Sequence, residues 1–141
     1  MRRFIRLLAL ATILPMPAFS HALDDQLTCE ATPHDFVSEL VQLQSIKTPA
    51  SRVEGNSVNA FRPARGAALT AFGFRVCAVF GYQPGDPLFE AGTGKPASGP
   101  IYGAVVFGSS EAVQRRLTEA GSHAVTHSVI PLVLTAIVCA Q

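Results

Sequence analysis

The chain has 141 residues, of which 15% are charged, and eleven Lys and Arg residues nearly balance ten Asp and Glu residues. This length suffices for one domain with a single hydrophobic core. Beyond the N-terminal arginines, the only basic pairs are Arg62/Arg65 and Arg115/Arg116, which are interpreted as ordinary solvated surface. Because positive and negative charges nearly balance, neither nucleic acid nor an anionic membrane is expected as a partner.

The N-terminal residues have the pattern of a bacterial secretory signal peptide. Arg2, Arg3 and Arg6 precede an apolar run over residues 7–14. This run is shorter than the ~20 residues that a membrane span requires. Ser20-His21-Ala22 places small residues at positions −3 and −1 of a cleavage site, and a second possible site follows Ser20. We expect residues 1–22 to be a signal peptide that is cleaved after Ala22.

Cleavage after Ala22 changes both the charge and the compartment of the remaining chain. Residues 23–141 form one expected exported domain, which keeps eight Lys and Arg residues against ten Asp and Glu residues, a net charge of −2. We expect this domain to be periplasmic or secreted, with no membrane span after cleavage. Such compartments are oxidising, so cysteines there tend to form disulfides.

The three cysteines are Cys29, Cys77 and Cys139. Cys29 and Cys139 lie near the two ends of the expected domain, and chain ends often lie close together at a domain surface. The prediction is a Cys29–Cys139 disulfide with Cys77 free and buried in a strand, and the alternative pairing is Cys77–Cys139. No two cysteines have the spacing of a metal-ligand pair, so no metal site is expected.

The first predicted helix begins after Thr32. This residue can cap the helix, Pro33 suits its first position, and Asp35 lies near the positive end of its dipole. Apolar residues at helical spacing continue from Phe36, and the helix is expected to end near Ser45. A strand is predicted over residues 57–62.

The strongest strand signal runs from Leu69 to Tyr82. Aromatic residues occupy alternate positions there, whereas glycine, arginine and small residues occupy the others. This alternation predicts one two-faced strand whose aromatic face is packed. The long Pro- and Gly-rich segment 83–100 follows and is predicted to be an irregular loop.

The C-terminal part predicts a strand over 101–107 and a helix over 111–120 that Gly121 ends. A long strand over 124–139 follows, in which Pro131 favours a sheet edge or a bulge. The predicted fold class is α+β: a single domain with a mainly antiparallel sheet of about four strands and two helices packed on one face.

No constellation of catalytic or metal-binding residues stands out. His123 and His127 are four residues apart, which along a strand is ~13 Å and too far for one metal ion. Segment 92–96 lacks the pattern of a phosphate-binding loop, so no cofactor is expected. Ser109 and Ser110 are interpreted mainly as helix caps.

Three functions remain open. The leading hypothesis is a non-enzymatic interaction module whose loop presents Tyr82, Leu88 and Phe89 to a protein partner of the cell envelope or medium. The second is a small-ligand binder with an apolar pocket. The third is a small serine hydrolase that uses Ser109 or Ser110 with His123. The expected pocket residues of the second hypothesis are Phe72, Phe74, Phe80 and Phe107.

Overall fold

The computed structural model describes residues 12–13 and 19–141. Most of the predicted signal peptide, residues 1–11 and 14–18, lies outside the described residues. The elements along the chain are β1 (Phe19–Ala22), the 3-10 turn η1 (Gln26–Thr28), α1 (Pro33–Gln42), β2 (Arg52–Val53), β3 (Asn59–Phe61), β4 (Ala67–Ala71), β5 (Phe74–Tyr82), β6 (Ile101–Phe107), α2 (Ser110–Glu119), β7 (Val125–Ile130) and β8 (Leu134–Ala140).

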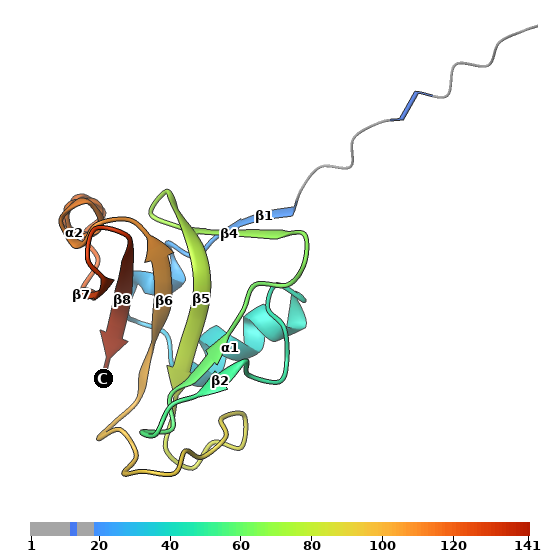
Figure 1. Cartoon of the computed structure of the whole chain (residues 1–141), viewed down its shortest axis with the longest axis vertical. Coiled ribbons are helices and arrows are strands. Elements are labelled where there is room, and N and C mark those ends of the chain that lie inside the picture. The colour runs from blue at the N-terminus through green and yellow to red at the C-terminus, as the bar shows by residue number, and fades with distance from the viewer. Residues whose placement is uncertain (1–11, 14–18) are drawn as a thin grey trace, which may run out of the picture.

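These strands form one mixed sheet of eight strands (Figure 1). The main order is β1-β4-β5-β6-β8-β7, and the β2–β3 hairpin joins through β3 to β5. The pair β1–β4 is parallel, whereas the other pairs are antiparallel. The prediction of a four-stranded sheet is therefore wrong, although the chain is α+β in the broad sense.

The extra strands arise partly because the segment 69–82 is a hairpin and not one strand. Phe72 and Gly73 both have positive φ angles, of 51° and 86°. Two consecutive residues of this kind form the tight turn that joins antiparallel strands. Ala71 pairs with Phe74 across it, and the Asp24 carboxylate accepts a hydrogen bond from the Phe72 N–H at 2.8 Å. The sequence did not predict this turn, because apolar residues alternate through it without a break and phenylalanine is a rare turn residue.

The segment 124–139 is likewise a hairpin, formed by β7 and β8. The turn follows Ile130, and Leu132 adopts a φ of 63°. The Val133 carbonyl accepts the Gly108 N–H at 2.8 Å, which holds the turn against the end of β6. Pro131 lies in this turn, so the prediction of one continuous strand over 124–139 is wrong, although β7 is an edge strand of the described sheet and its register shifts between Ser128 and Ile130.

Both helices pack on the same face of the sheet. Phe36, Val37 and Leu40 of α1 and Val113 and Leu117 of α2 belong to one buried cluster with core residues of β4, β5, β6 and β8. The Thr32 hydroxyl caps α1, as predicted, by accepting the Asp35 N–H, and α1 ends at Gln42, earlier than expected. The Ser109 hydroxyl caps α2 in the same way, and Gly121 takes the expected positive φ after it.

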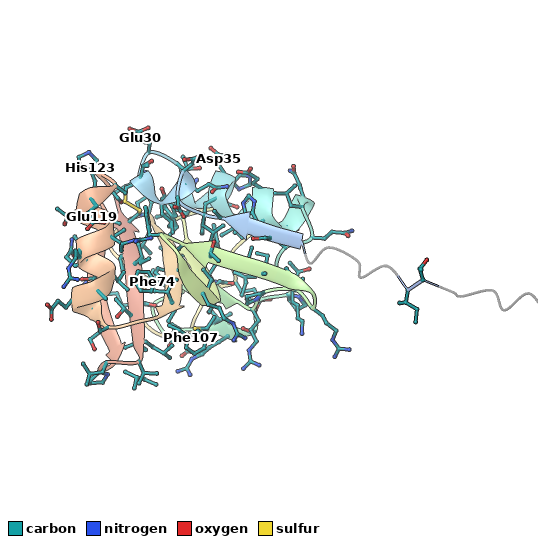
Figure 2. The ribbon with its side chains drawn as sticks, turned by 90° about the horizontal axis from the view of Figure 1, so that it is seen from above. Glu30, Asp35, Phe74, Phe107, Glu119 and His123 are labelled. Carbon is teal, nitrogen blue, oxygen red and sulfur yellow. A yellow bond between two sulfur atoms is a disulfide. The ribbon has the colours of Figure 1, made fainter. Side chains whose placement is uncertain are left out.

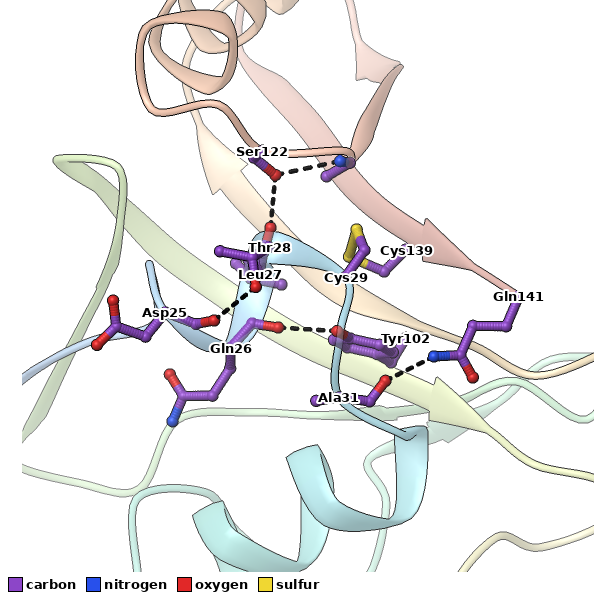
Figure 3. The surroundings of a disulfide bond; sticks show 11 residues. Asp25, Gln26, Leu27, Thr28, Cys29, Ala31, Tyr102, Ser122, Cys139 and Gln141 are labelled. Atoms are coloured by element: carbon purple, nitrogen blue, oxygen red, sulfur yellow. Dashed lines mark hydrogen bonds between the residues drawn. A yellow bond between two sulfur atoms is a disulfide. The ribbon is translucent and has the colours of Figure 1, made fainter.

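The Cys29–Cys139 disulfide is confirmed, and Cys77 is free. Cys77 is half-buried at a β-bulge between Val76 and Ala78, so its predicted full burial is wrong. The disulfide joins the segment after η1 to the last strand (Figure 3). Beside it, the Tyr102 hydroxyl donates to the Gln26 carbonyl, and the Gln141 amide donates to the Ala31 carbonyl at 2.7 Å.

Candidate interaction surface

The face of the sheet opposite the helices carries a second, smaller apolar cluster. Phe80 of β5 and Ala136 and Val138 of β8 are buried there, and they pack with half-buried residues of neighbouring strands. No residue of either helix belongs to this cluster. Figure 2 shows Phe107 on the side of the sheet away from α1, whose region Asp35 marks. Among the described residues, this face is therefore without a helical cover.

A glycine makes the middle of this helix-free face flat. A Cβ atom on Gly103 would lie 1.9 Å from the Ile137 carbonyl oxygen and 2.7 Å from the Phe80 ring. Gly103 pairs with Phe80 across the β5–β6 ladder. The aromatic ring therefore lies over the glycine, where any larger residue would collide with the backbone of β8.

The exposed apolar side chains concentrate at one end of this face. Leu132 in the β7–β8 turn is 85% exposed, and four neighbours are between 44% and 51% exposed. Phe107 and Ile130 both pair with Leu134, and the Val133 carbonyl accepts the Gly108 N–H, so the end of β6 and the β7–β8 turn are backbone neighbours. We call this group the apolar tip: Phe107, Val129, Ile130, Leu132 and Val133. Contiguous exposed apolar groups of this kind mark interaction sites on folded proteins.

The Arg75 side chain lies beside the apolar tip. The Arg75 guanidinium lies 5.4 Å from the centre of the Phe107 ring, within the range of a cation–π interaction. Arg75 precedes the β-bulge in β5, which shifts the register between Val76 and Ala78. Because a bulge changes the alternation of side chains along a strand, Phe74 packs with the helical core whereas Phe80 packs on the opposite face.

Strand β7 adds an open backbone edge to the surface. It is the last strand of the sheet order, and all of its residues except Thr126 are exposed. An edge strand presents unpaired N–H and C=O groups, which natural proteins usually protect with charged residues or proline. The sequence of β7, Val125 to Ile130, contains neither lysine nor an acidic residue nor proline.

The three predicted binding residues lie differently from expectation. Phe89 is buried in the main core, and Tyr82 and Leu88 are half-buried and pack against it. The ring of Phe89 approaches the position that a Cβ atom would take on Gly81 to 3.0 Å. These side chains therefore hold the loop 83–100 to the core, and only part of Tyr82 and Leu88 is available at the surface.

Sequence reasoning missed the residue that fixes the middle of this loop. Asn59 is buried, its side chain accepts the Glu90 N–H at 3.0 Å, and it donates to the Glu90 carbonyl at 2.9 Å. Further along, Gly92 approaches the β2–β3 hairpin so closely that a Cβ atom would lie 2.1 Å from the Glu54 carbonyl oxygen. The glycines of this loop thus allow close backbone packing, a role that the sequence did not indicate.

His34 and Asp86 form a contact that the sequence also did not reveal. The His34 Nδ1 atom lies 2.6 Å from the Asp86 carboxylate, whose other oxygen accepts the Leu88 N–H. The carboxylate is nearly buried, whereas the imidazole is about half exposed. Such a pair orients a histidine for proton transfer, but no hydroxyl or thiol is hydrogen-bonded to His34 in the described part of the chain. The pair ties the loop 83–100 to the start of α1.

The candidate serine nucleophiles are engaged in local contacts. The Ser109 hydroxyl accepts the Ala112 N–H, and the Ser110 hydroxyl lies 3.2 Å from the Thr135 hydroxyl. Across residues 19–141, neither serine is hydrogen-bonded to His123 or His127, which are both exposed. The geometry gives no support to a serine hydrolase.

The four phenylalanines of the proposed ligand pocket do not share one cavity. Phe72 and Phe74 pack with the helical core, whereas Phe80 lies in the opposite cluster and Phe107 is exposed. Phe72 and Phe74 line an open hollow of about 300 Å³ together with Gly73, Ala112, Arg115 and Arg116. The enclosed aromatic pocket that the ligand hypothesis requires is therefore not formed by these residues.

Comparison with protein-family models, with curated proteins and with solved structures finds no match for this chain. Among the described residues, no helix is long and apolar enough to cross a membrane. The same residues contain no group of three or more His, Cys, Asp or Glu side chains that could hold a metal ion.

Proposed function

We propose that this protein is an exported, non-enzymatic interaction module that docks onto a partner protein through the apolar tip and the adjoining helix-free face. The observation that carries this proposal is the gathering of five large, exposed apolar residues at the end of β6 and in the neighbouring β7–β8 hairpin, beside β7, which is the last of the described strands in the sheet order. Exposing large apolar side chains to water is unfavourable in free energy. Their grouping at one end of the sheet therefore favours a docking role.

Export is part of the proposal. Residues 1–22 act as a signal peptide, cleavage follows Ala22, and the domain works in the periplasm or in the medium. The Cys29–Cys139 disulfide supports this, because structural disulfides persist in oxidising compartments. The partner is then an envelope or secreted protein, such as an enzyme that the module inhibits.

The chemistry of the surface defines the kind of partner. The tip offers an aromatic ring and branched aliphatic side chains, and the Arg75 guanidinium lies over the Phe107 ring. A complementary surface is an apolar groove with an acidic or carbonyl group at its rim, where Arg75 can be paired. The largest binding contribution is expected from Phe107 and Leu132, since buried large side chains dominate interfaces.

The test compares a tip variant with a matched control. Leu132→Ser with Val129→Thr removes exposed apolar surface, and Leu43→Ser removes an apolar side chain that is 44% exposed next to the end of α1. Each tagged protein is purified from a cell-envelope extract, and retained proteins are quantified by mass spectrometry. We expect the wild type and the Leu43 variant to retain a partner that the tip variant loses. Equal retention by all three proteins would refute the role of the tip.

The loop 83–100 is a second candidate surface for the same function. It is rigidly held through Asn59 and through the His34–Asp86 contact, and Tyr82 and Leu88 remain partly exposed. Rigid loops on a stable scaffold are common recognition elements. In the same extract experiment, Leu88→Ser would lose the partner if the loop, and not the tip, makes the contact.

A further inference from the structure

The sheet splits between β4 and β5. These strands pair only through the last two residues of β4 and the first two of β5, next to the tight turn. Further along, β5 pairs with β3 through residues 79–81. Residues 67–69 of β4 and 76–78 of β5 therefore have no ladder between them among the described strands, and Figure 1 shows β4 running away from β5.

A groove of about 490 Å³ occupies this split. Pro63 and Gly66, from the connection between β3 and β4, line one end of it, and the buried residues Leu69 and Val76 line it from the main core. Of the lining residues, only Thr70 and Arg75 carry a polar side chain. A volume of this size with an apolar lining and few polar groups is typical of sites for small molecules.

Arg75 lies at the rim of the groove. Residues opposite each other in an antiparallel pair have their side chains on the same face, so Thr70 and Arg75 share one face of the sheet. Ala68 is two residues from Thr70 along β4 and lies on that face as well. Because the Arg75 guanidinium lies over the Phe107 ring, this is the helix-free face, and the groove opens toward it.

The chain around the groove is electropositive. Residues 55–85 contain Arg62, Arg65 and Arg75 but no lysine and no acidic residue. The three arginines are exposed, and none of them is in an ion pair within the described part of the chain. The Asp24 carboxylate lies at the tight turn, where it accepts the Phe72 N–H, and does not line the groove. An anionic group is therefore complementary to the rim of the groove.

We propose that the groove between β4 and β5 binds a single-chain fatty acid, with its alkyl chain against Pro63, Ala67 and Val76 and its carboxylate paired with Arg75. A guanidinium binds a carboxylate through two parallel hydrogen bonds, and each methylene buried in the groove adds affinity. The inference goes beyond docking at the apolar tip, because none of the five tip residues lines the groove.

The ligand class is tested by NMR titration of the isotope-labelled exported protein with hexanoate, octanoate, decanoate and decanol. The affinity is expected to rise about fourfold for each added methylene. Decanol has the same chain as decanoate but no charge, and it is expected to bind about tenfold more weakly. The shifted amides should include those of residues 67–69 and 76–78. An affinity that is independent of chain length, equal binding of decanol, or unchanged amides at the groove would overturn the proposal.

A pair of arginine variants tests the contact with the carboxylate. Arg75→Gln is expected to weaken decanoate about tenfold and to leave decanol unchanged. Arg115→Gln is the matched control, because Arg115 lines the separate hollow beside α2 and should not affect either ligand. A loss of decanoate binding in the Arg115 variant, or equal binding by the Arg75 variant and the wild type, would contradict the assignment of the site.

The tip variant separates this inference from the proposed docking function. Leu132→Ser with Val129→Thr leaves the groove intact and is expected to bind decanoate as the wild type does. If this variant loses decanoate, the fatty acid binds at the tip and the groove proposal is wrong. Loss of the partner protein with unchanged decanoate binding would show that the two surfaces act independently.

Discussion

Tyr102 connects the sheet to the segment that carries the disulfide. Its side chain is fully buried, its ring lies 4.9 Å from that of Phe36, and its hydroxyl donates to the Gln26 carbonyl at 2.8 Å. Burial raises the pKa of the Tyr102 hydroxyl above its ordinary value, so the hydroxyl keeps its proton and remains a donor. The residue thus holds α1, β6 and η1 together.

The substitution Tyr102→Phe is expected to lower the free energy of unfolding by about 1–3 kcal/mol, because a buried carbonyl loses its donor. The effect also depends on pH. Since the pKa is raised in the folded state, the contribution is fully present below the ordinary tyrosine pKa of about 10 and is lost as the pH rises above it. Denaturant unfolding from pH 7 to 11 should show a steeper alkaline loss for the wild type than for Tyr102→Phe; parallel curves would contradict the role of this hydroxyl.

Gly103 is the residue on which the flatness of the helix-free face depends. Gly103→Ala places a methyl group against the backbone of β8, and we expect a loss of about 3 kcal/mol or more in stability, the range of severe backbone strain. Gly55→Ala is the matched control, because no atom lies within 4 Å of its Cβ position and its φ is ordinary. Thermal unfolding of the two variants measures the difference, and a similar small change for both would refute the close packing at Gly103.

At the scale of elements, the sequence predicted the helices better than the strands. Thr32 and Ser109 cap the helices through side-chain oxygens, and such caps are local signals that a sequence carries directly. Two turns, at Phe72–Gly73 and Pro131–Val133, lie inside continuous apolar runs. The pattern of apolar residues therefore gave no sign that the strands are interrupted there. A turn with phenylalanine or leucine at positive φ is stabilised by tertiary contacts, and these are not visible in the sequence.

The candidate site was less predictable than the fold for a related reason. Tyr82, Leu88 and Phe89 were expected at the surface because they lie at the start of the long loop or within it, whereas Phe89 is buried in the core. The apolar tip combines residues of β6 with residues of the β7–β8 hairpin, and their proximity depends on strand pairing across the sheet. The two-faced character of β5 was recognised, but the bulge at Cys77, which moves Phe80 to the opposite face, was not.

At the scale of the whole molecule, the disulfide is a covalent constraint between cysteines with a sequence separation of 110. The double variant Cys29→Ser with Cys139→Ser is expected to lose about 4–5 kcal/mol of stability, because the unfolded chain gains conformational freedom. Cys77→Ser is the control and should change stability little. Denaturant unfolding with and without reductant checks this: reductant should destabilise the wild type but not the double variant.

Cys77 is not expected to interfere with that measurement. Burial raises the pKa of the Cys77 thiol, and a backbone hydrogen bond and the nearby Arg75 only partly offset this. Little thiolate is therefore present at neutral pH, and exchange with the Cys29–Cys139 disulfide is slow. Scrambled disulfides that include Cys77 in the folded protein would contradict this account.

The docking role of the apolar tip is tested most directly by site-specific photo-crosslinking in living cells. A photoreactive residue replaces Val129 at the tip or, as the matched control, Gln114 on the exposed side of α2. The account predicts a discrete crosslinked product of higher mass from position 129, and none from position 114. Contradiction would come from the absence of a product at position 129, or from the same product at both positions.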